Sequence, residues 1–406
     1  MRPSMLSQAK EALKGAIKDV VLWGVLPWAY RRHARRPVNV GSVLFLERKL
    51  AELPDSFKEL HGRLSADSAR RVGFLSLGYG RAGVVGYYLN CLRAVKAVAR
   101  TEVVFLDDAS DVISCLPLRP ETKVVQLWHA CGAFKKWGMS TADLLFGGSR
   151  ADKKRHPFYE NLSLVTVSSP EVVWAYAEAM DLEGREGIIK PLGVSRTDVF
   201  FQDGFVASAR SAVEEAVPAC AGKKVLLYAP TFRGKANEAV GPDALDVAAL
   251  KRVLGGEWVL FVKHHPFVAK RPEVPEGCRD FAFDVSAALP IDKLLCRADA
   301  CVSDYSSLVF EYSLLGRPMA FSAYDKDDYD DWRGFYYDYD ELTPGPVFSR
   351  NEDLVDYLAH VDERFDADRV RLFRDRFMSA CDGRATERII GEVFGDGALP
   401  PPGPQE

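Results

Sequence analysis

Short apolar runs rich in β-branched residues alternate with helical patterns along most of the chain. The runs lie at 72–77, 102–108, 123–129, 163–169 and 187–193 in the first half, and at 223–231, 257–265, 279–285, 300–306 and 318–324 in the second. Between them, regularly spaced apolar positions predict helices, as in DALDVAALKRVLG and EDLVDYLAHVDERF. Strands that are apolar on both faces and separated by helices are typical of parallel sheets. The pattern therefore predicts two α/β domains, each with a parallel sheet of about five strands.

The boundary between the two predicted domains falls near 200–222, where no apolar run is suited to a strand. We place the N-terminal domain at 38–205 and the C-terminal domain at 206–392. Residues 393–406 are proline-rich and polar, and we expect a disordered tail there. Residues 1–37 differ again, because a lysine-bearing amphipathic stretch is followed by an apolar aromatic patch and a basic cluster, RRHARR.

The segment 1–37 has the composition of a membrane-surface anchor. Trp23, Trp28 and Tyr30 stand beside the basic cluster. Such rings sit at the level of the lipid headgroups, while arginines meet anionic lipid. The apolar patch is too short to span a bilayer, and Pro27 interrupts it. The alternative is an ordinary N-terminal helix packed on the body, but we expect an amphipathic helix that associates with a membrane.

Charge and cysteine content narrow the class of protein. The 406 residues carry a formal net charge of -4, so no global field attracts nucleic acid, and any basic site must be local. The eight cysteines form no CxxC pair, and most lie in apolar surroundings. Buried reduced thiols fit this pattern better than a zinc site or a disulfide framework, and they indicate a reducing cytosolic compartment.

The turn GYGRAG at 78–83 matches the glycine pattern of dinucleotide-binding proteins, since it follows a strand and opens a helical pattern. Asp107 and Asp108 end the next strand, somewhat later than the acidic residue of that fingerprint. No second dehydrogenase feature accompanies them. We therefore favour a tight strand-to-helix turn over a nicotinamide site.

Ligands of open parallel sheets bind beyond the carboxyl ends of the strands, so residues after each strand are candidates. In QLWHACGAFKKWG, His129 closes a predicted strand, and a neutral imidazole there can remove a proton from an attacking hydroxyl. Gly132 permits a close backbone approach, and Lys135 and Lys136 can neutralise phosphate. Cys131 lacks the evident partners of a thiol nucleophile. On these residues alone, a structural histidine with solvated lysines is an equal alternative.

Two strands of the second domain also end in polar residues. Thr231 and Arg233 stand at the end of LLYAPTFRG, where an arginine suits bidentate phosphate recognition. His264 and His265 end the next strand. In the strand pattern His265 shares a side with Lys263, while His264 faces the other way. A histidine that faces another across a cleft suits an acid–base or phosphate-contacting pair.

In SDYSSLVFEYSLLGRP a strand that ends near Asp304 meets a helix. Ser306 and Ser307 suit its N-cap, where backbone N–H groups and the positive end of the helix dipole can receive a phosphate. Glu311 lies further inside the helix and can reach ribose hydroxyls. The alternative is that the serines only cap the helix and Glu311 is solvated. We favour the anion site, because a cap needs one serine.

The segment AYDKDDYDDWRGFYYDYDELTPGP is acidic and aromatic, and its pattern resembles neither a helix nor a strand. We expect a loop that packs its aromatic rings over the cleft. Aspartate-dense runs can bind calcium, but the spacing of an EF-hand is absent.

Six of these segments together resemble the CDP-glycerol glycerophosphotransferase family, the enzymes of teichoic acid synthesis. The resemblance extends over roughly residues 40–390. In order, the matching stretches are QLWHACGAFKKWG, LGVSRTDVFF, LLYAPTFRG, VKHHP, SDYSSLVFEYSLLGRP and AYDKDDYDDWRGFYYDYDELTPGP.

The resemblance implies a GT-B architecture, in which two Rossmann-like domains face each other across a cleft. The N-terminal domain would take the acceptor, and the C-terminal domain would bind CDP-glycerol or CDP-ribitol. An acceptor hydroxyl would attack the β-phosphate and release CMP, with no cofactor and no metal. The acceptor would be lipid-linked, on undecaprenyl diphosphate, and the enzyme would lie peripherally on the cytoplasmic face of the cell membrane.

The resemblance also implies roles for individual residues. His129 would be the general base, and His265 would stabilise the pyrophosphate and the transferring phosphoryl group. Charge neutralisation and positioning are most of what phosphoryl transfer needs. Arg196 and Asp198 would shape the cleft near the hinge. The substrate-binding set would be Arg233, Thr231, Asp304, Ser306, Ser307, Glu311, Lys136 and Arg196.

Some choices stay open at this level. Ala130, Cys131 and Gly132 follow the motif histidine where many relatives have glycine, threonine and proline, which bears on the choice of acceptor. The donor can be the glycerol or the ribitol compound, and the absence of an extra binding domain favours a single or limited addition. The rivals are a GT-B glycosyltransferase that uses a nucleotide sugar and a non-catalytic membrane-surface protein. The full set of polar residues argues against the latter.

Overall fold

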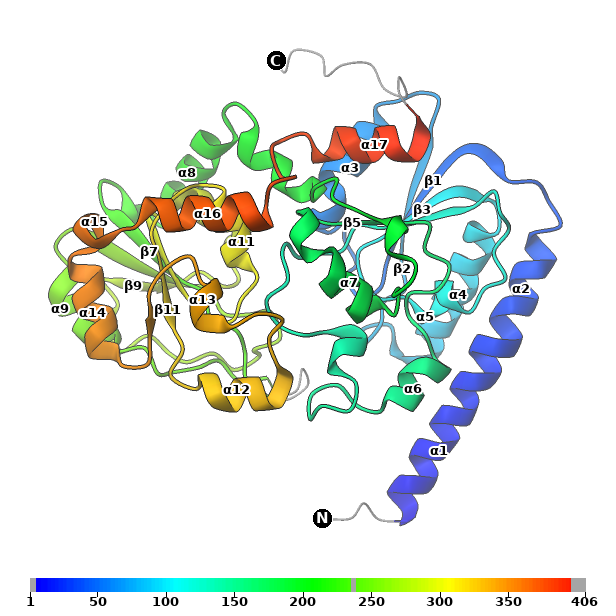
Figure 1. The fold of residues 1–406 in the computed structure, drawn as a ribbon, viewed down its shortest axis with the longest axis horizontal. Coiled ribbons are helices and arrows are strands. Elements are labelled where there is room, and N and C mark those ends of the chain that lie inside the picture. Colours follow the sequence, from blue (N-terminus) through cyan, green and yellow to red (C-terminus); the bar gives the residue numbers. More distant parts are fainter. Residues whose placement is uncertain (1–4, 235–238, 396–406) are drawn as a thin grey trace.

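The computed structural model describes residues 5–234 and 239–395, which form two domains with one parallel six-stranded sheet each (Figure 1). The N-terminal sheet has the order β2-β1-β3-β4-β5-β6. Its strands are β1 (Asn39–Glu47), β2 (Arg71–Ser76), β3 (Thr101–Leu106), β4 (Lys123–Gln126), β5 (Leu164–Thr166) and β6 (Ile189–Lys190). The helices of this domain are α3 (Asp55–Ser65), α4 (Gly83–Val98), α5 (Asp111–Ser114), α6 (Arg150–Arg155) and α7 (Val173–Met180).

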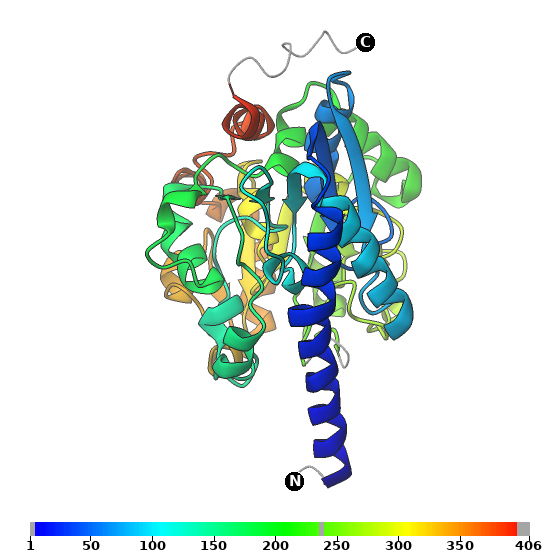
Figure 2. The same ribbon diagram turned by 90° about the vertical axis from the view of Figure 1, so that its right-hand side faces the viewer.

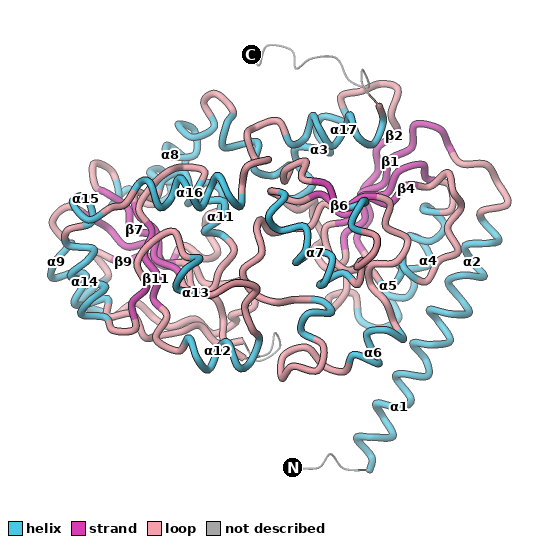
Figure 3. Tube along the Cα trace, viewed as in Figure 1, coloured by secondary structure: helices cyan, strands magenta, loops and turns pink. Residues whose placement is uncertain are grey.

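The C-terminal sheet has the order β12-β11-β10-β7-β8-β9. Its strands are β7 (Lys224–Tyr228), β8 (Trp258–Val262), β9 (Ala282–Asp284), β10 (Ala300–Ser303), β11 (Met319–Ser322) and β12 (Val347–Phe348). In both domains the strands gather inside and the helices lie around them (Figure 3). The helices here are α8 (Phe205–Ala216), α9 (Val247–Leu254), α10 (Ile291–Arg297), α11 (Leu308–Ser313), α12 (Lys326–Arg333), α13 (Tyr339–Leu342), α14 (Asn351–Ala359), α15 (Val361–Arg364) and α16 (Ala367–Phe377).

The two parallel sheets confirm the predicted fold class, and each predicted strand is present. The strands β1 and β12 were not predicted. β1 lies between β2 and β3, and its Phe45 is fully buried against Phe57 and Phe105, with ring centroids 5.0 Å apart in both pairs. Gly41 and Ser42 interrupt its apolar run, which is why the pattern concealed a central strand.

The last helix, α17 (Ala385–Phe394), returns to the N-terminal domain. Its Ile389 and Val393 are buried in one cluster with Phe57 of α3 and with β1. The carboxylate of Asp198 accepts hydrogen bonds from the first backbone N–H groups of α17, at 3.0 and 2.7 Å. The predicted division at 205/206 therefore differs from the structure at this helix, which packs with the first sheet. Of the predicted tail, 396–406 lies outside the described residues.

The N-terminal segment is a continuous helical rod that projects beyond the body (Figure 2). It consists of α1 (Met5–Val20), one π-helical turn (Val21–Val25) and α2 (Leu26–His33). Pro27 does not break the rod; it lies at the start of α2, directly after the π-helical turn. Leu26 and Tyr30 are buried against the body, whereas Trp23 and Trp28 are exposed. Within the described residues, no helix is long and apolar enough to cross a bilayer.

The acidic aromatic segment contains two helices, α12 and α13. The prediction that this segment is a loop without a helix was therefore wrong. Asp327 and Asp328 in the first turn of α12 and Arg333 in its last turn complement the helix dipole. The expected packing of aromatic rings is present, since Tyr329 and Tyr339 are buried. The segment also contacts the N-terminal domain through backbone hydrogen bonds from 134–136 to 334–336.

Gly132 packs tightly against the C-terminal domain. Its φ is 63°, and an added Cβ would lie 2.3 Å from the ring of Phe310 in α11. The close approach predicted for this glycine is therefore to an aromatic ring of the other domain.

We predict that Gly132→Ala destabilises the protein more than Gly184→Ala. Both glycines have positive φ, but an added Cβ at Gly184 meets nothing within 4 Å. The extra cost at Gly132 comes from overpacking against Phe310. It lowers the free energy of unfolding by a further amount of about 1–3 kcal/mol, the usual cost of an overpacked core. Urea denaturation followed by tryptophan fluorescence measures both variants. Equal losses would show that the contact with Phe310 relaxes freely.

Candidate active site

Residues that follow strands of both sheets share one electrostatic neighbourhood between the domains. His265 follows β8, and the charges of Lys135, Arg333, His129 and Lys49 all act on its pKa. These groups come from two segments of the N-terminal domain, after β1 and after β4, and from the end of α12. The carboxyl ends of the strands therefore contribute to one shared site, as the rule for open parallel sheets predicts.

His129 lies on a loop rather than at the end of a strand. β4 ends at Gln126, and Trp128 has a φ of 58°, which turns the chain so that the imidazole is exposed. Its Nδ1 lies 2.7 Å from the carbonyl oxygen of Asp107. A carbonyl only accepts, so Nδ1 carries the proton of the neutral ring and Nε2 carries the lone pair. This is the tautomer that a general base needs.

His265 is fixed in the opposite tautomer. The backbone N–H of Phe267 donates to its Nδ1 at 3.2 Å, so the neutral ring carries its proton on Nε2. The rings of Phe232 and Phe267 flank it at 4.8 and 4.7 Å. Burial, together with the nearby Lys135 and Arg333, lowers the pKa of His265 to about 4. The ring is therefore a neutral hydrogen-bond donor at neutral pH.

The two lysines of the motif have different surroundings. Lys135 is half-buried, and burial together with Arg333 lowers the pKa of its ammonium group to about 7. Lys136 instead donates its backbone N–H to the carbonyl of Gly334 and packs its side chain against that glycine. Of the two lysines for which we predicted phosphate neutralisation, Lys135 shares the surroundings of His265, whereas Lys136 is bound to Gly334 through its backbone. Arg333 was missed, because only the fold brings the end of α12 to the cleft.

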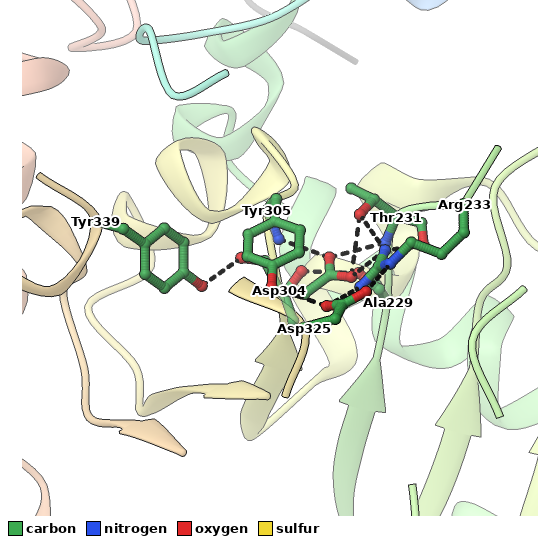
Figure 4. Close-up of polar contacts among 8 residues, drawn as sticks. Ala229, Thr231, Arg233, Asp304, Tyr305, Asp325 and Tyr339 are labelled. Atoms are coloured by element: carbon green, nitrogen blue, oxygen red, sulfur yellow. Dashed lines mark hydrogen bonds and ion pairs between the residues drawn. The ribbon is translucent and has the colours of Figure 1, made fainter. Parts of the chain in front are cut away.

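Arg233 is bound to carboxylates rather than directed at an empty cleft (Figure 4). Its Nη2 donates to Asp325 at 2.9 Å, and its Nη1 donates to Asp304 and to the hydroxyl of Thr231 at 3.0 and 2.9 Å. Asp304 also accepts the backbone N–H groups of Thr231 and Tyr305. These bonds use most donors of the guanidinium. In this structure Arg233, Thr231 and Asp304 organise the loops after β7 and β10, and their direct contact with phosphate stays a prediction.

The two serines before α11 are partly exposed, whereas Glu311 within the helix is buried. Ser306 and Ser307 are half-buried before the helix, and Ser306 Oγ accepts from the N–H of Leu308 at 3.4 Å. Glu311 is buried, and its two oxygens lie 2.6 and 2.8 Å from the guanidinium of Arg196. Both oxygens are thus engaged by Arg196 in an ion pair between the domains, and the contact with ribose stays a prediction.

Arg196 connects this ion pair to the proposed base. Besides binding Glu311, it donates from Nη1 to the carbonyl oxygen of His129 at 2.9 Å. Arg196 lies in the 3₁₀ turn Ser195–Phe201, directly before the crossing into the C-terminal domain. The predicted role near the hinge agrees with this position, although the partner Glu311 was not foreseen.

A buried carboxyl group behind His129 was also missed. Asp107 accepts a hydrogen bond from Ser56 Oγ at 2.6 Å, and burial raises the pKa of its carboxyl group to about 6. In the sequence it stood out only as a possible ribose ligand of a dinucleotide site. The preceding GYGRAG segment is a strand-to-helix turn, with positive φ at Gly78, Gly80 and Gly83.

The cysteines are all buried and free, as predicted. Cys131 is 3.9 Å from a carboxylate oxygen of Glu311. The neighbouring thiol of Cys381 and burial raise the pKa of Cys131, which disfavours a thiolate nucleophile. Among the side chains that the structure describes, no group of three or more His, Cys, Asp and Glu residues could hold a metal ion.

Two α/β domains with parallel sheets, whose strand ends contribute to one cation-lined site with His129 and His265, have the GT-B architecture. The family model of CDP-glycerol:poly(glycerophosphate) glycerophosphotransferase matches residues 28–395. The chain therefore belongs to this family, and the dehydrogenase interpretation of GYGRAG is excluded.

Curated relatives of the chain act in teichoic acid synthesis. A teichoic acid ribitol-phosphate primase of Bacillus spizizenii is 34% identical, over 91% of this chain and 95% of the relative. A glycerol-phosphate primase of the same organism is 32% identical, over 75% of this chain and 77% of the relative. A poly(ribitol-phosphate) polymerase is 36% identical, but the chain spans only 47% of its length.

The fold is also that of a solved structure. The wall teichoic acid polymerase TagF superimposes with a TM-score of 0.73 at 21% identity, and the match covers 97% of this chain and 98% of that one. A TagF variant soaked with CDPG gives a TM-score of 0.74.

We predict that Arg196→Met is strongly destabilising, because it leaves Glu311 buried without its cation. The loss is on the order of 3–5 kcal/mol, and adding Glu311→Gln recovers part of it. Arg371→Met is the matched control, since its pair with Asp368 is exposed and is worth no more than about 1 kcal/mol. Denaturant unfolding of the double-mutant cycle measures the coupling. A cost for Arg196→Met no larger than that of the control would contradict the role of this pair.

We also predict that anion binding makes Lys135 take up a proton. A phosphate beside the ammonium group raises its pKa above about 7, so at pH about 8 the free side chain is mostly neutral and the bound one is charged. Calorimetric titration with CDP in buffers of different ionisation enthalpy measures this uptake. Lys135→Met removes it and Lys136→Met preserves it; uptake that persists without Lys135 would assign the proton elsewhere.

Proposed function

We propose that this enzyme transfers one ribitol phosphate unit from CDP-ribitol to a hydroxyl of a lipid-linked acceptor and releases CMP. The observation that carries the proposal is the match to a ribitol-phosphate primase along 95% of the relative's length. Glycerol phosphate is the second candidate for the transferred group, supported by the match to a glycerol-phosphate primase.

The histidine tautomers support a direct displacement at phosphorus. Nε2 of His129 takes the proton of the acceptor hydroxyl as its oxygen bonds to the β-phosphorus. The bond from this phosphorus to the bridging oxygen breaks, and the electron pair leaves with CMP. The negative charge of the diphosphate is stabilised by the Nε2–H group of His265 and by the side chains of Lys135 and Arg333. The ion-paired Arg233 holds the loops after β7 and β10 and, through Asp325, the start of α12, the helix that carries Arg333.

The environment of His129 favours its role as a base. The carbonyl of Asp107 keeps Nδ1 protonated, so proton uptake at Nε2 yields an imidazolium that still donates to that carbonyl. The carboxyl group of Asp107 is close enough to interact with the charge of His129, and its ionised form stabilises that imidazolium.

The proposed acceptor is an undecaprenyl diphosphate-linked saccharide at the cytoplasmic face of the cell membrane. Peripheral attachment through α1 and α2 is supported by their exposed surface, where Trp23 and Trp28 are 48% and 64% exposed. Arg31 and Arg32 continue this surface in the last turn of α2. Aromatic rings followed by arginines are suited to the interface between acyl chains and anionic headgroups.

The decisive measurement is CMP release from a panel of CDP-ribitol, CDP-glycerol and UDP-sugars with a lipid diphosphate disaccharide bearing glycerol phosphate. We expect turnover with CDP-ribitol and a product one ribitol phosphate heavier by mass spectrometry. Preference for CDP-glycerol would change the proposed donor from CDP-ribitol to CDP-glycerol and leave the proposed reaction unchanged. Turnover with a UDP-sugar alone would overturn the proposal in favour of a glycosyltransferase.

We predict that His129→Ala lowers kcat by about 100-fold or more, because about 100-fold is the smallest usual contribution of a general base. The exposed His360→Ala is the matched control and retains full activity. Circular dichroism and nucleotide affinity should be unchanged in both variants, because neither imidazole is packed in the core. Full activity of His129→Ala would remove the base assignment.

A further inference from the structure

A basic cavity lies at the end of the N-terminal domain that is opposite the active site. Its volume is about 460 Å³, and it is enclosed by the first residues of β1 and β2, the C-terminal half of α4 and the turn after α2. All of these mark the amino edge of the sheet, whereas the catalytic residues follow the carboxyl ends of the strands. No residue assigned to catalysis or donor binding lines this cavity.

The cavity concentrates cations that have no counter-ion. Among the side chains that the structure describes, none of its basic groups forms an ion pair with a carboxylate. The carboxylate of Glu102, beside the lining residue Thr101, accepts instead from the N–H of Gly41. In a protein with a net charge of -4, a cluster of unpaired basic side chains has the composition of an anion-binding site. The basic lining residues are His33, Arg36, Arg71, Arg93, Lys96 and Arg100.

Several of these cations are held in place without an anion. Arg100 donates to the side-chain oxygen of Asn39 at 2.8 Å, and its Nε is buried without a partner. Arg71 donates to the carbonyl of Val40 at 3.1 Å, and Arg93 donates to Asn90 at 3.0 Å. The turn that carries Arg36 is fixed by hydrogen bonds from Arg119 to its carbonyl groups. The donors are therefore preorganised around the cavity, which lowers the entropic cost of binding an anion.

The surface next to the cavity indicates the source of the anion. On α4, the exposed positions change from apolar at Val85 and Leu89 to basic at Arg93 and Lys96 along one face. α2 lies beside α4 and shows the same change, from exposed Trp28 to the arginines that follow it (Figure 2). Both helices end at the amino edge of the sheet, so their apolar and basic halves lie together. A soluble anion would make no contact with the exposed apolar half of these helices, whereas a lipid would contact both halves.

We propose that this cavity binds the phosphate headgroup of an anionic phospholipid when the apolar faces of α2 and α4 enter the membrane. The proposal rests on the peripheral attachment that belongs to the proposed function. Arginines bind phosphate oxygens in bidentate fashion, which a lysine of equal charge cannot reproduce. The cavity adds recognition of the headgroup to an attachment that would otherwise depend on charge and apolar area alone.

The test uses variants that keep every charge. Arg71→Lys with Arg93→Lys alters the cavity, and Arg31→Lys with Arg32→Lys alters the same surface outside it. The full-length variants are titrated with vesicles of phosphatidylcholine, with and without phosphatidylglycerol. We expect the cavity variant to bind the anionic vesicles about tenfold more weakly, the effect of one lost charge-assisted hydrogen bond, and the control to bind like wild type.

The other outcomes overturn the proposal in distinct ways. Equal affinities for the cavity and control variants would show that attachment senses charge alone. Vesicle binding that is unaffected while the cavity variant loses affinity for inorganic phosphate or glycerol 3-phosphate would make the cavity a site for soluble anions. Absence of binding to any vesicle would exclude the attachment itself. CMP release with a water-soluble acceptor analogue, measured on the same samples, tests the transferase function separately, and we expect it to be equal in all variants.

Discussion

The ion pair between Arg196 and Glu311 is the contact on which the geometry of the cleft depends. A carboxylate as buried as Glu311 is costly without a cation, so α11 can keep its place only while Arg196 reaches it from the hinge. The same guanidinium holds the carbonyl of His129. One side chain thus links the proposed base in one domain to α11 in the other. The contact of Gly132 with Phe310 limits how closely the domains can approach.

The chemistry of the two histidines is set by backbone groups rather than by side chains. The carbonyl of Asp107 requires a proton on Nδ1 of His129, and the N–H of Phe267 requires a lone pair on Nδ1 of His265. The Nε2 atoms of the two neutral rings are therefore in complementary states, one accepting and one donating. No change of tautomer is needed when substrates arrive, so the site is preorganised for proton removal beside a charged diphosphate.

The sequence predicted the parts of the site that depend on strand ends. Parallel strands are continuous apolar runs, and a polar residue that ends such a run stands out, as His129 and His265 do. It could not predict pairings, because an arginine can meet any anion that the fold brings near. Arg233 was expected to meet phosphate and instead meets Asp325, which is 92 residues away in the chain. Glu311 was expected to meet ribose and is neutralised by Arg196 across the hinge.

The direction of the sheet relates the membrane surface to the active site. α4 begins at the GYGRAG turn, immediately after β2 and therefore at the carboxyl edge, where the catalytic residues also lie. Its first exposed residues, Val84 and Val85, are apolar and 74% and 73% exposed. In the proposed membrane attachment, this places the apolar end of the attachment surface on the side of the cleft. The proposed lipid-linked acceptor could then present its headgroup to His129 while its chain stays in the bilayer.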